Sequence, residues 1–221
     1  MNLLQYCIYD ILLVSCFLTG CIVIRKNWPL ENKLLLALTG LTILIEMIEQ
    51  ICFFFLKMTF VEWLYNCFTP VECASLVYIF YRSSEYPAIK RLNAVLLLLL
   101  PVGAGFLYYL HPLFITINDH VVVFYLFVEL ISACSIIIDL LLGQSQSPLT
   151  RQPLFWLASG MLFFSGLYIV MVSIIFKLKM TNILFIYEIL NQIIANSCMY
   201  AGFLIYFVRQ HQVMTEQVIE Q

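Results

Sequence analysis

Charged residues are scarce in this chain. Asp, Glu, Lys and Arg make up 11% of its 221 residues, whereas 63% of the residues are hydrophobic. An ordinary soluble domain carries about 25% charged residues, so this composition excludes a soluble globular protein. No polar stretch is long enough to form a separate soluble domain. We therefore expect one membrane domain over residues 1–221 and no nucleic-acid partner.

Catalytic and metal-binding motifs are also missing. The chain has no P-loop, GxSxG or HExxH motif. Its eight cysteines include no CxxC pair, and His111, His120 and His211 lie in loops, in the tail or at the edge of an apolar stretch. Residues 184–208, the last apolar stretch, contain no lysine that could carry a retinal. We therefore expect no enzymatic activity, no metal and no cofactor.

Seven apolar stretches are long enough to cross a bilayer, which takes about 20 residues per helix. They cover residues 5–24, 34–56, 59–81, 92–110, 120–142, 153–176 and 184–208. The connections between them are short, so consecutive stretches must be antiparallel neighbours. The sequence thus predicts an all-α membrane protein, a bundle of seven transmembrane helices surrounded by the lipid bilayer.

Positively charged residues are divided unequally between the two ends of these spans. Three lie on one side, Lys57, Lys177 and Lys179. Eight lie on the other side: Arg25, Lys26, Lys33, Arg82, Lys90, Arg91, Arg151 and Arg209. Because Lys and Arg favour the cytoplasmic side, this distribution predicts an N-terminus outside and a C-terminus in the cytoplasm.

A weak internal repeat relates the first three predicted spans to the last three. Gly40 and Gly160 are 120 residues apart, and Asn66 and Asn191 are 125 residues apart. These offsets are compatible with a 3+1+3 parallel repeat, in which a linking fourth span joins two sets of three.

Acidic residues inside the predicted spans are the strongest functional signal. Eight of the 13 acidic residues lie there: Asp10, Glu46, Glu49, Glu62, Glu72, Glu129, Asp139 and Glu188. No Lys or Arg lies well inside a span to pair with them. A charge at the bilayer centre costs about 2.5–3.5 kcal/mol, so such residues usually serve a function.

The acids share helix faces with other polar side chains. Glu46, Glu49 and Gln50, for example, fall on one face of the second predicted helix. Polar faces of membrane helices turn toward the bundle interior or a wet cavity. We predict an outward-facing pocket for a small cationic or polar ligand, lined by Glu46, Glu49, Gln50, Glu62, Asn66, Glu129, Glu188, Asn191 and Gln192.

Other interpretations of the acidic residues inside the predicted spans remain open. Glu72 lies near mid-depth and Asp139 near the cytoplasmic face, so a small transporter for protons, cations or a polar solute could use both residues on its path. A structural subunit could match its acids to a partner's intramembrane Arg or Lys. In the simplest alternative, protonated carboxyls only hydrogen-bond the helices together.

Two segments resemble signatures of an uncharacterised family of small bacterial seven-span membrane proteins. YNCFTPVECASLVYIFYR has a glutamate six residues after an asparagine, and RQPLFWLASGMLFFSG has Pro-Leu-Phe-Trp before a small residue and Gly. The matching residues are Asn66, Glu72, Pro153, Phe155, Trp156 and Gly160. Similar modules form the membrane sensor parts of bacterial signalling proteins. The resemblance implies a receptor-like sensor in the bacterial cytoplasmic membrane, with a protein partner at its cytoplasmic loops.

Overall fold

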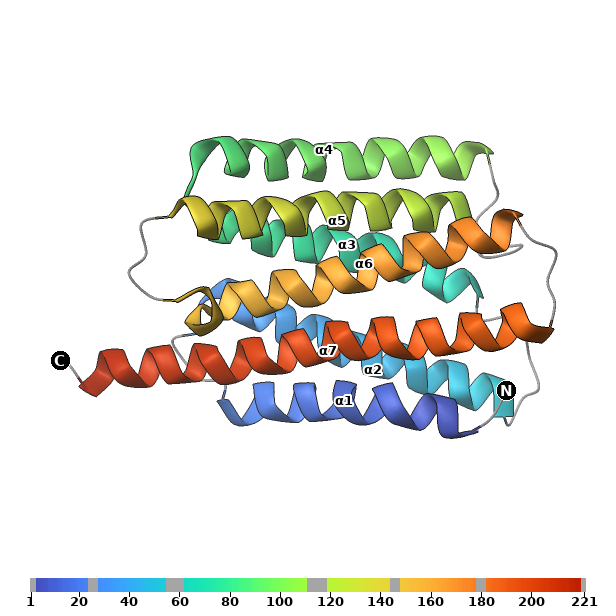
Figure 1. The fold of residues 1–221 in the computed structure, drawn as a ribbon, viewed down its shortest axis with the longest axis horizontal. Coiled ribbons are helices and arrows are strands. Elements are labelled where there is room, and N and C mark those ends of the chain that lie inside the picture. The colour runs from blue at the N-terminus through green and yellow to red at the C-terminus, as the bar shows by residue number, and fades with distance from the viewer. Residues whose placement is uncertain are drawn as a thin grey trace.

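The computed structural model describes residues 3–23, 28–54, 62–110, 119–143, 148–177 and 182–219, although some side chains near the helix ends lie outside this description. Seven α-helices and one short 3₁₀ turn make up the described part, which confirms the prediction of an all-helical chain. The helices are α1 (Leu3–Val23), α2 (Leu30–Phe54), α3 (Glu62–Ser83), α4 (Pro87–Leu110), α5 (Asp119–Leu142), α6 (Pro153–Lys177) and α7 (Asn182–Ile219), as Figure 1 shows.

Four of these helices are long and apolar enough to cross a membrane. They are α2, α4, α5 and α6, with spans at Leu30–Cys52, Pro87–Phe106, Val121–Leu142 and Pro153–Ile174. Large apolar side chains also cover the outer surface, where Ile22 is 83% exposed and Tyr109 is 87% exposed. An apolar exterior of this extent suits contact with lipid rather than water. The four helices therefore indicate a membrane protein.

Several helices begin before the apolar stretches that predicted them. Proline marks two of these starts, with Pro87 as the first residue of α4 and Pro29 just ahead of α2. Proline suits the start of a helix because the missing N–H would have no intrahelical partner there. The helix α7 continues beyond its apolar stretch to Ile219 and projects past the other helices (Figure 1). Hydropathy locates the apolar part of a helix and not its ends.

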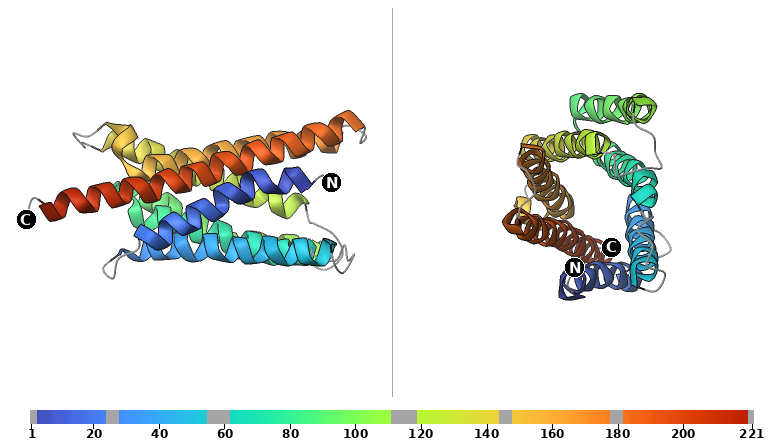
Figure 2. Two further views of the ribbon diagram at one scale, coloured as in Figure 1. Left: turned by 90° about the horizontal axis from the view of Figure 1, so that it is seen from below. Right: turned by 90° about the vertical axis from the view of Figure 1, so that its right-hand side faces the viewer.

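Six helices form a closed ring in the order α1, α2, α3, α5, α6 and α7. Each of them packs against its two neighbours in this order, and α7 packs against α1 to close the ring. The remaining helix, α4, lies outside the ring against α3 and α5, as the end view in Figure 2 shows. The interior of the ring is therefore enclosed by helices that are far apart in the sequence.

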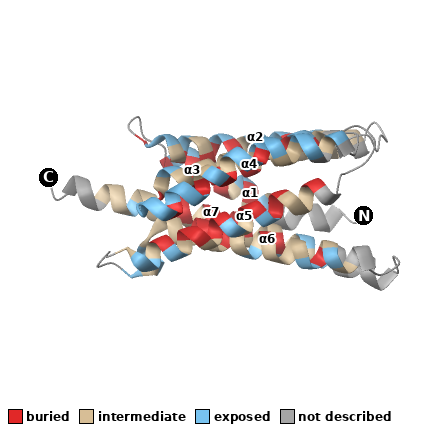
Figure 3. Ribbon diagram, turned by 90° about the horizontal axis from the view of Figure 1, so that it is seen from above, coloured by how far each residue is buried: buried red, intermediate tan, exposed pale blue. Residues whose placement is uncertain are grey.

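Buried side chains gather inside the ring, whereas exposed residues follow the outer helix surfaces (Figure 3). The half of the bundle nearer the C-terminus of α7 is filled by large apolar side chains that are at most 1% exposed. We call this cluster the apolar plug. It consists of Leu35, Leu76, Ile79, Phe80, Ile136, Leu157, Phe203 and Phe207.

Polar contacts tie the start of α4 to the end of α5. Both carboxylate oxygens of Asp139 accept hydrogen bonds, one from the backbone N–H of Glu85 at 3.0 Å and one from that of Tyr86 at 2.9 Å. The buried Asn93 amide donates to the Ser135 hydroxyl at 3.1 Å. The Asp139 contacts satisfy backbone N–H groups that precede α4, where an acidic side chain also suits the helix dipole, and the Asn93 contact joins α4 to α5 further along.

The only ion pair among the described residues joins α2 to the end of α3. The Arg82 guanidinium lies 3.0 Å from a carboxylate oxygen of Glu31. This hydrogen bond and the negative charge of Glu31 raise the pKa of Arg82 above its usual value. Because Arg82 is exposed, the pair adds little stability and mainly marks where α2 and α3 meet.

Pro70 lies inside α3 and has no N–H to donate to the carbonyl of Asn66, four residues earlier. The hydroxyl of Tyr108 on α4 donates to that carbonyl instead. An unsatisfied carbonyl is costly in a membrane interior because no water is at hand. The outer helix α4 thus supplies a hydrogen bond that α3 cannot make for itself.

We expect the substitution Tyr108→Phe to lower the free energy of unfolding by about 1–3 kcal/mol, the cost of leaving a buried acceptor without a partner. Reversible unfolding by SDS in mixed micelles, followed by circular dichroism, measures this change. Tyr109→Phe is the matched control, because the side chain of Tyr109 faces outward. Equal effects of the two substitutions would contradict this role of Tyr108.

Candidate ligand-binding cavity

A partly enclosed cavity of about 280 Å³ lies inside the ring. The described lining residues come from five helices, α2, α3, α5, α6 and α7. The lining residues are Thr42, Glu46 and Glu49 of α2, Tyr65, Phe68, Thr69 and Glu72 of α3, Val122, Tyr125, Leu126 and Glu129 of α5, Phe164 and Tyr168 of α6, and Gln192, Asn196, Met199 and Tyr200 of α7. The cavity thus brings together residues from both halves of the sequence.

The lining combines acidic and aromatic side chains. Among the described lining residues, four are glutamates, six are aromatic, and none is Lys, Arg or His. Two more, Gln192 and Asn196, offer amide groups that can both donate and accept hydrogen bonds. A cavity with several acidic groups and no basic side chain in its lining suits a positively charged occupant.

Glu129 is the most deeply buried of these acids and is only 3% exposed. One of its carboxylate oxygens accepts a hydrogen bond from the Ser165 hydroxyl of α6 at 3.2 Å. Glu72 of α3 lies close enough for the two carboxyl groups to interact electrostatically. Ser165 therefore helps to fix the orientation of Glu129, and the two carboxyl groups approach each other from the neighbouring helices α3 and α5.

Glu49 lies near the end of α2, where the Tyr65 hydroxyl of α3 donates a hydrogen bond to its carboxylate. This contact joins two consecutive helices across their connection. Val122, three residues into α5, lines the same cavity as Glu129, seven residues further on. At about 1.5 Å per residue, the cavity extends about 10 Å along α5.

Tyr168 of α6 connects the acidic part of the cavity to its amide groups. Its hydroxyl lies beside the side chains of Gln192 and Asn196, and it also interacts electrostatically with Glu46 and Glu72. The neighbouring turn of α7 adds Met199 and Tyr200 to the lining. Beyond this turn, Phe203 and Phe207 belong to the apolar plug. The cavity therefore ends where the plug begins.

No protein-family model, curated protein or solved structure gives a significant match to this chain. The resemblance to small bacterial seven-span proteins stays a prediction. The arguments about function rest on the geometry of the cavity.

The structure brings together five of the eleven residues proposed for the pocket and for the path. Glu46, Glu49, Glu129 and Gln192 line the cavity as the pocket prediction requires. Glu72, assigned to a separate and deeper path, lies in the same cavity near Glu129. Glu72 therefore lines the inner part of this cavity.

Other predicted pocket residues lie outside the lining. The side-chain amide of Gln50 donates to Asp10 of α1 at 2.9 Å, and that of Asn191 donates to the backbone carbonyl of Leu167 at 3.1 Å. Asn66 is buried beside Pro70. These three polar groups connect helices.

Three further predicted residues need separate mention. Glu62 and Glu188 lie on α3 and α7, but their side chains are outside the described part of the structure. Asp139 lies at the end of α5, with both carboxylate oxygens bonded to backbone N–H groups before α4. It does not belong to the lining of the cavity. A path through Asp139 stays a prediction.

The sequence prediction missed the aromatic part of the lining. Phe164 and Tyr168 are four residues apart on α6 and therefore share a face. That spacing was visible in the sequence, but aromatic residues occur throughout these helices, so the spacing alone did not stand out. Polar residues are rare in such helices, and for this reason they were easier to recognise.

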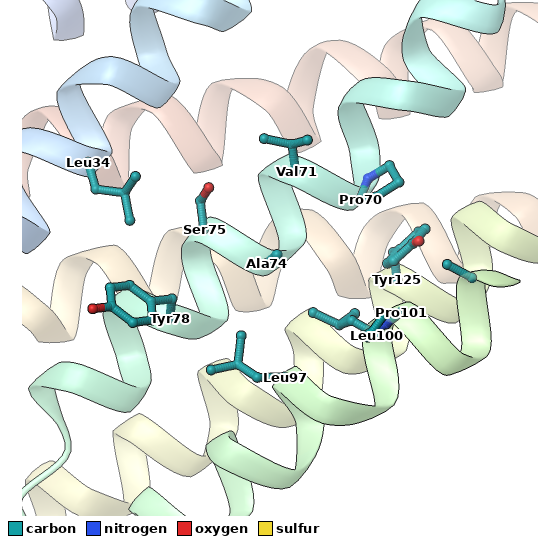
Figure 4. Close-up of a pocket in the computed structure, with 11 residues that line it drawn as sticks. Leu34, Pro70, Val71, Ala74, Ser75, Tyr78, Leu97, Leu100, Pro101 and Tyr125 are labelled. Atoms are coloured by element: carbon teal, nitrogen blue, oxygen red, sulfur yellow. The ribbon is translucent and has the colours of Figure 1, made fainter.

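An apolar groove of about 530 Å³ lies between α3 and α4, on the outer side of the ring. Figure 4 shows Tyr125 of α5 near Pro70 and Pro101, the prolines of the two groove helices. The lining of the groove contains no charged residue. Tyr125 lines both the groove and the acidic cavity, so its ring forms part of the wall between them.

Proposed function

We propose that this chain is a non-enzymatic, receptor-like sensor that crosses the bacterial cytoplasmic membrane seven times. Its N-terminus would lie outside and its C-terminus in the cytoplasm. The cavity would open to the outside and bind a small cationic or polar ligand. The observation that carries this proposal is the acidic cavity inside the ring, bounded on its inner side by the apolar plug.

The apolar plug favours a receptor over an open path across the membrane. Phe80, Phe203 and Phe207 are at most 1% exposed and fill the ring below the cavity. A charged solute could not pass these side chains without losing its hydration at high cost. The ligand would therefore enter and leave on the same side, as a sensed molecule does.

The helix α7 offers a route for the output. It supplies Gln192, Asn196, Met199 and Tyr200 to the cavity and then continues as one helix to Ile219, beyond the ring. A ligand that moves the cavity part of α7 would also move its projecting end. We propose that this end and the cytoplasmic loops contact a protein partner.

The order of the helices supports a second candidate function, a small secondary transporter. In the ring, α1, α2 and α3 occupy positions related to those of α5, α6 and α7 by a half-turn, and α4 lies outside as a linker would. Repeats of this kind are common in transporters, whose substrates bind at the repeat interface. The two repeat glycines contact different neighbours, Phe17 of α1 for Gly40 and the backbone of α7 for Gly160, so this support comes from the helix order alone.

The third hypothesis, a structural subunit that pairs its acids with a partner's cations, predicts a carboxyl group that faces lipid. The described acids inside the predicted spans are all buried or half-buried. None of these described acids favours that role.

Labelling of single introduced cysteines tests the receptor proposal. We expect Thr69→Cys, in the cavity, to react with a membrane-impermeant maleimide added outside intact cells. Ile136→Cys, in the apolar plug, should stay unmodified from either side. Mass spectrometry of peptides locates the label without removal of the native cysteines. An unreactive Thr69→Cys would contradict an outward cavity, and labelling of either site from the cytoplasmic side would favour the transporter.

A further inference from the structure

We infer that the cavity binds a small organic ammonium ion, held between the carboxyl groups and the aromatic faces of its wall. This inference rests on the proposed function, because it names the ligand class of the same cavity. It narrows the ligand from any cationic or polar molecule to one that joins a positive charge to an apolar body.

The first step concerns charge. The four glutamates of the lining come from three helices, α2, α3 and α5, and none of the described lining residues is basic. Glu72 and Glu129 interact with each other at the buried part of the cavity. An occupant with one positive charge between them would stabilise the ionised form of a carboxyl group. A neutral solute would not provide this stabilisation, and an anion would oppose it.

The second step separates an organic cation from a metal ion. Among the described residues, no group of three or more His, Cys, Asp or Glu side chains converges closely enough to hold a metal. Calcium, for example, needs 6–8 oxygen ligands within about 2.6 Å. The volume of about 280 Å³ also exceeds what a single bare ion fills. The size and the spread of the acids suit a small molecule.

The third step concerns the aromatic side chains. Tyr168 lies beside Gln192 and Asn196 and interacts electrostatically with Glu46 and Glu72, so an aromatic ring and carboxyl groups meet at one place. Tyr65, Phe68, Tyr125, Phe164 and Tyr200 complete the aromatic lining. Aromatic faces attract ammonium groups through cation–π interactions and also provide apolar contact for methyl or methylene groups. A strongly hydrated ion such as sodium would gain little from such walls.

The fourth step concerns the amide groups of the wall. Gln192 and Asn196 of α7 line the cavity, and both lie beside the Tyr168 hydroxyl. A side-chain amide can both donate and accept hydrogen bonds. These two residues therefore offer contacts for a polar group of the ligand, such as a hydroxyl next to the ammonium group.

Matched pairs of probes test this inference. Choline is compared with 3,3-dimethylbutan-1-ol, in which carbon replaces the charged nitrogen at almost the same shape. Phenethylammonium is compared with 2-phenylethanol, in which a hydroxyl replaces the ammonium group at the same chain length, and sodium chloride is titrated at constant ionic strength. Binding to the full chain in detergent is measured by isothermal titration calorimetry and by thermal stabilisation. We expect at least one ammonium probe to bind at least 10-fold more tightly than its neutral partner.

Variants connect this binding to the aromatic wall. Tyr168→Leu should weaken the binding of the ammonium probe about 10-fold, whereas Tyr168→Phe, which keeps the aromatic face, should change it less than threefold. Tyr78→Leu, at the apolar groove outside the cavity, should have no effect. Circular dichroism checks that each variant is folded. If Tyr168→Leu does not fold, the ammonium probe and its neutral partner are both titrated into Tyr168→Phe. Equal affinity of the two probes for this variant would overturn the inference.

The possible outcomes separate the ligand class from the proposed function. Equal binding of a neutral probe would overturn the ammonium inference and leave a ligand-binding cavity in place. Stabilisation by sodium alone would replace the organic ligand with an inorganic cation. Failure of every ammonium probe would also overturn the inference, whereas an unreactive Thr69→Cys would count against the proposed function itself.

Discussion

The substitution Gly202→Ala is expected to destabilise the protein by about 1–3 kcal/mol, although alanine is normally the better residue in a helix. A Cβ atom at Gly202 would lie 2.6 Å from the backbone carbonyl oxygen of Trp156 and 2.9 Å from the Cα atom of Gly160. Both neighbours are backbone atoms of α6 and cannot rotate away. The two helices would have to separate at their closest crossing, with loss of packing along α6 and α7. Reversible SDS unfolding in mixed micelles measures this loss.

Gly166→Ala is the matched control for this experiment. Gly166 also lies within α6, but a Cβ atom there would meet nothing within 4 Å. We expect this variant to be neutral or more stable by about 0.5–1 kcal/mol, because alanine loses less backbone entropy than glycine in a helix. Equal destabilisation of the two variants would show that the crossing at Gly202 and Gly160 does not limit the stability of the bundle.

The sequence predicted the number of helices well because each helix carries its own signal, a long apolar stretch bounded by polar residues. It could not predict the neighbours of each helix, because lipid-facing and interior residues are equally apolar. Gly160 is noted in the sequence as a repeat glycine, but nothing there identifies Gly202 as the residue that lies against it. Only the structure shows that α4 lies outside the ring and that α7 closes against α1.

The candidate site was predicted to the extent that it consists of rare residues. Glu46, Glu49 and Glu129 were assigned to one pocket from their helix faces, and the structure places all three in its lining. Gln50 shares the helix face of Glu46 but bonds to Asp10, because a neighbouring helix offered a nearer partner. An ideal helical wheel gives the direction of a side chain and not the identity of the group that it meets.

Glu72 illustrates the same limit. Its position near mid-depth suggested a separate role on a path across the membrane, and on an ideal helix it points about 80° away from Glu62. In the structure Glu72 lines the cavity together with Glu129. Depth along one helix does not show which residues of other helices lie beside it.

Glu129→Gln is expected to weaken binding of the ammonium probe by about 10- to 100-fold, the range that corresponds to loss of one hydrogen bond to a charged group. The amide of glutamine has nearly the shape of the carboxyl group and can still accept a hydrogen bond from Ser165. The substitution therefore removes the negative charge that this carboxyl group can carry and preserves the shape of the cavity. Titration calorimetry with choline or phenethylammonium, whichever binds the unmodified chain, measures the effect.

We expect Glu129→Gln to raise the free energy of unfolding or to leave it unchanged. Burial of an ionisable carboxyl group is costly, and Glu129 is only 3% exposed, so replacing it by the neutral glutamine removes that cost. Asp10→Asn is the control, because Asp10 is also a half-buried acid inside a predicted span but bonds to Gln50 outside the cavity. We expect Asp10→Asn to leave probe binding unchanged.

Loss of binding in both variants would indicate a general effect of charge. Loss of stability without loss of binding in Glu129→Gln would assign Glu129 to helix packing. A loss of affinity confined to Glu129→Gln, with stability kept, would show that this acid serves binding and not helix packing, and a gain of stability would show that it does so at a cost to the fold.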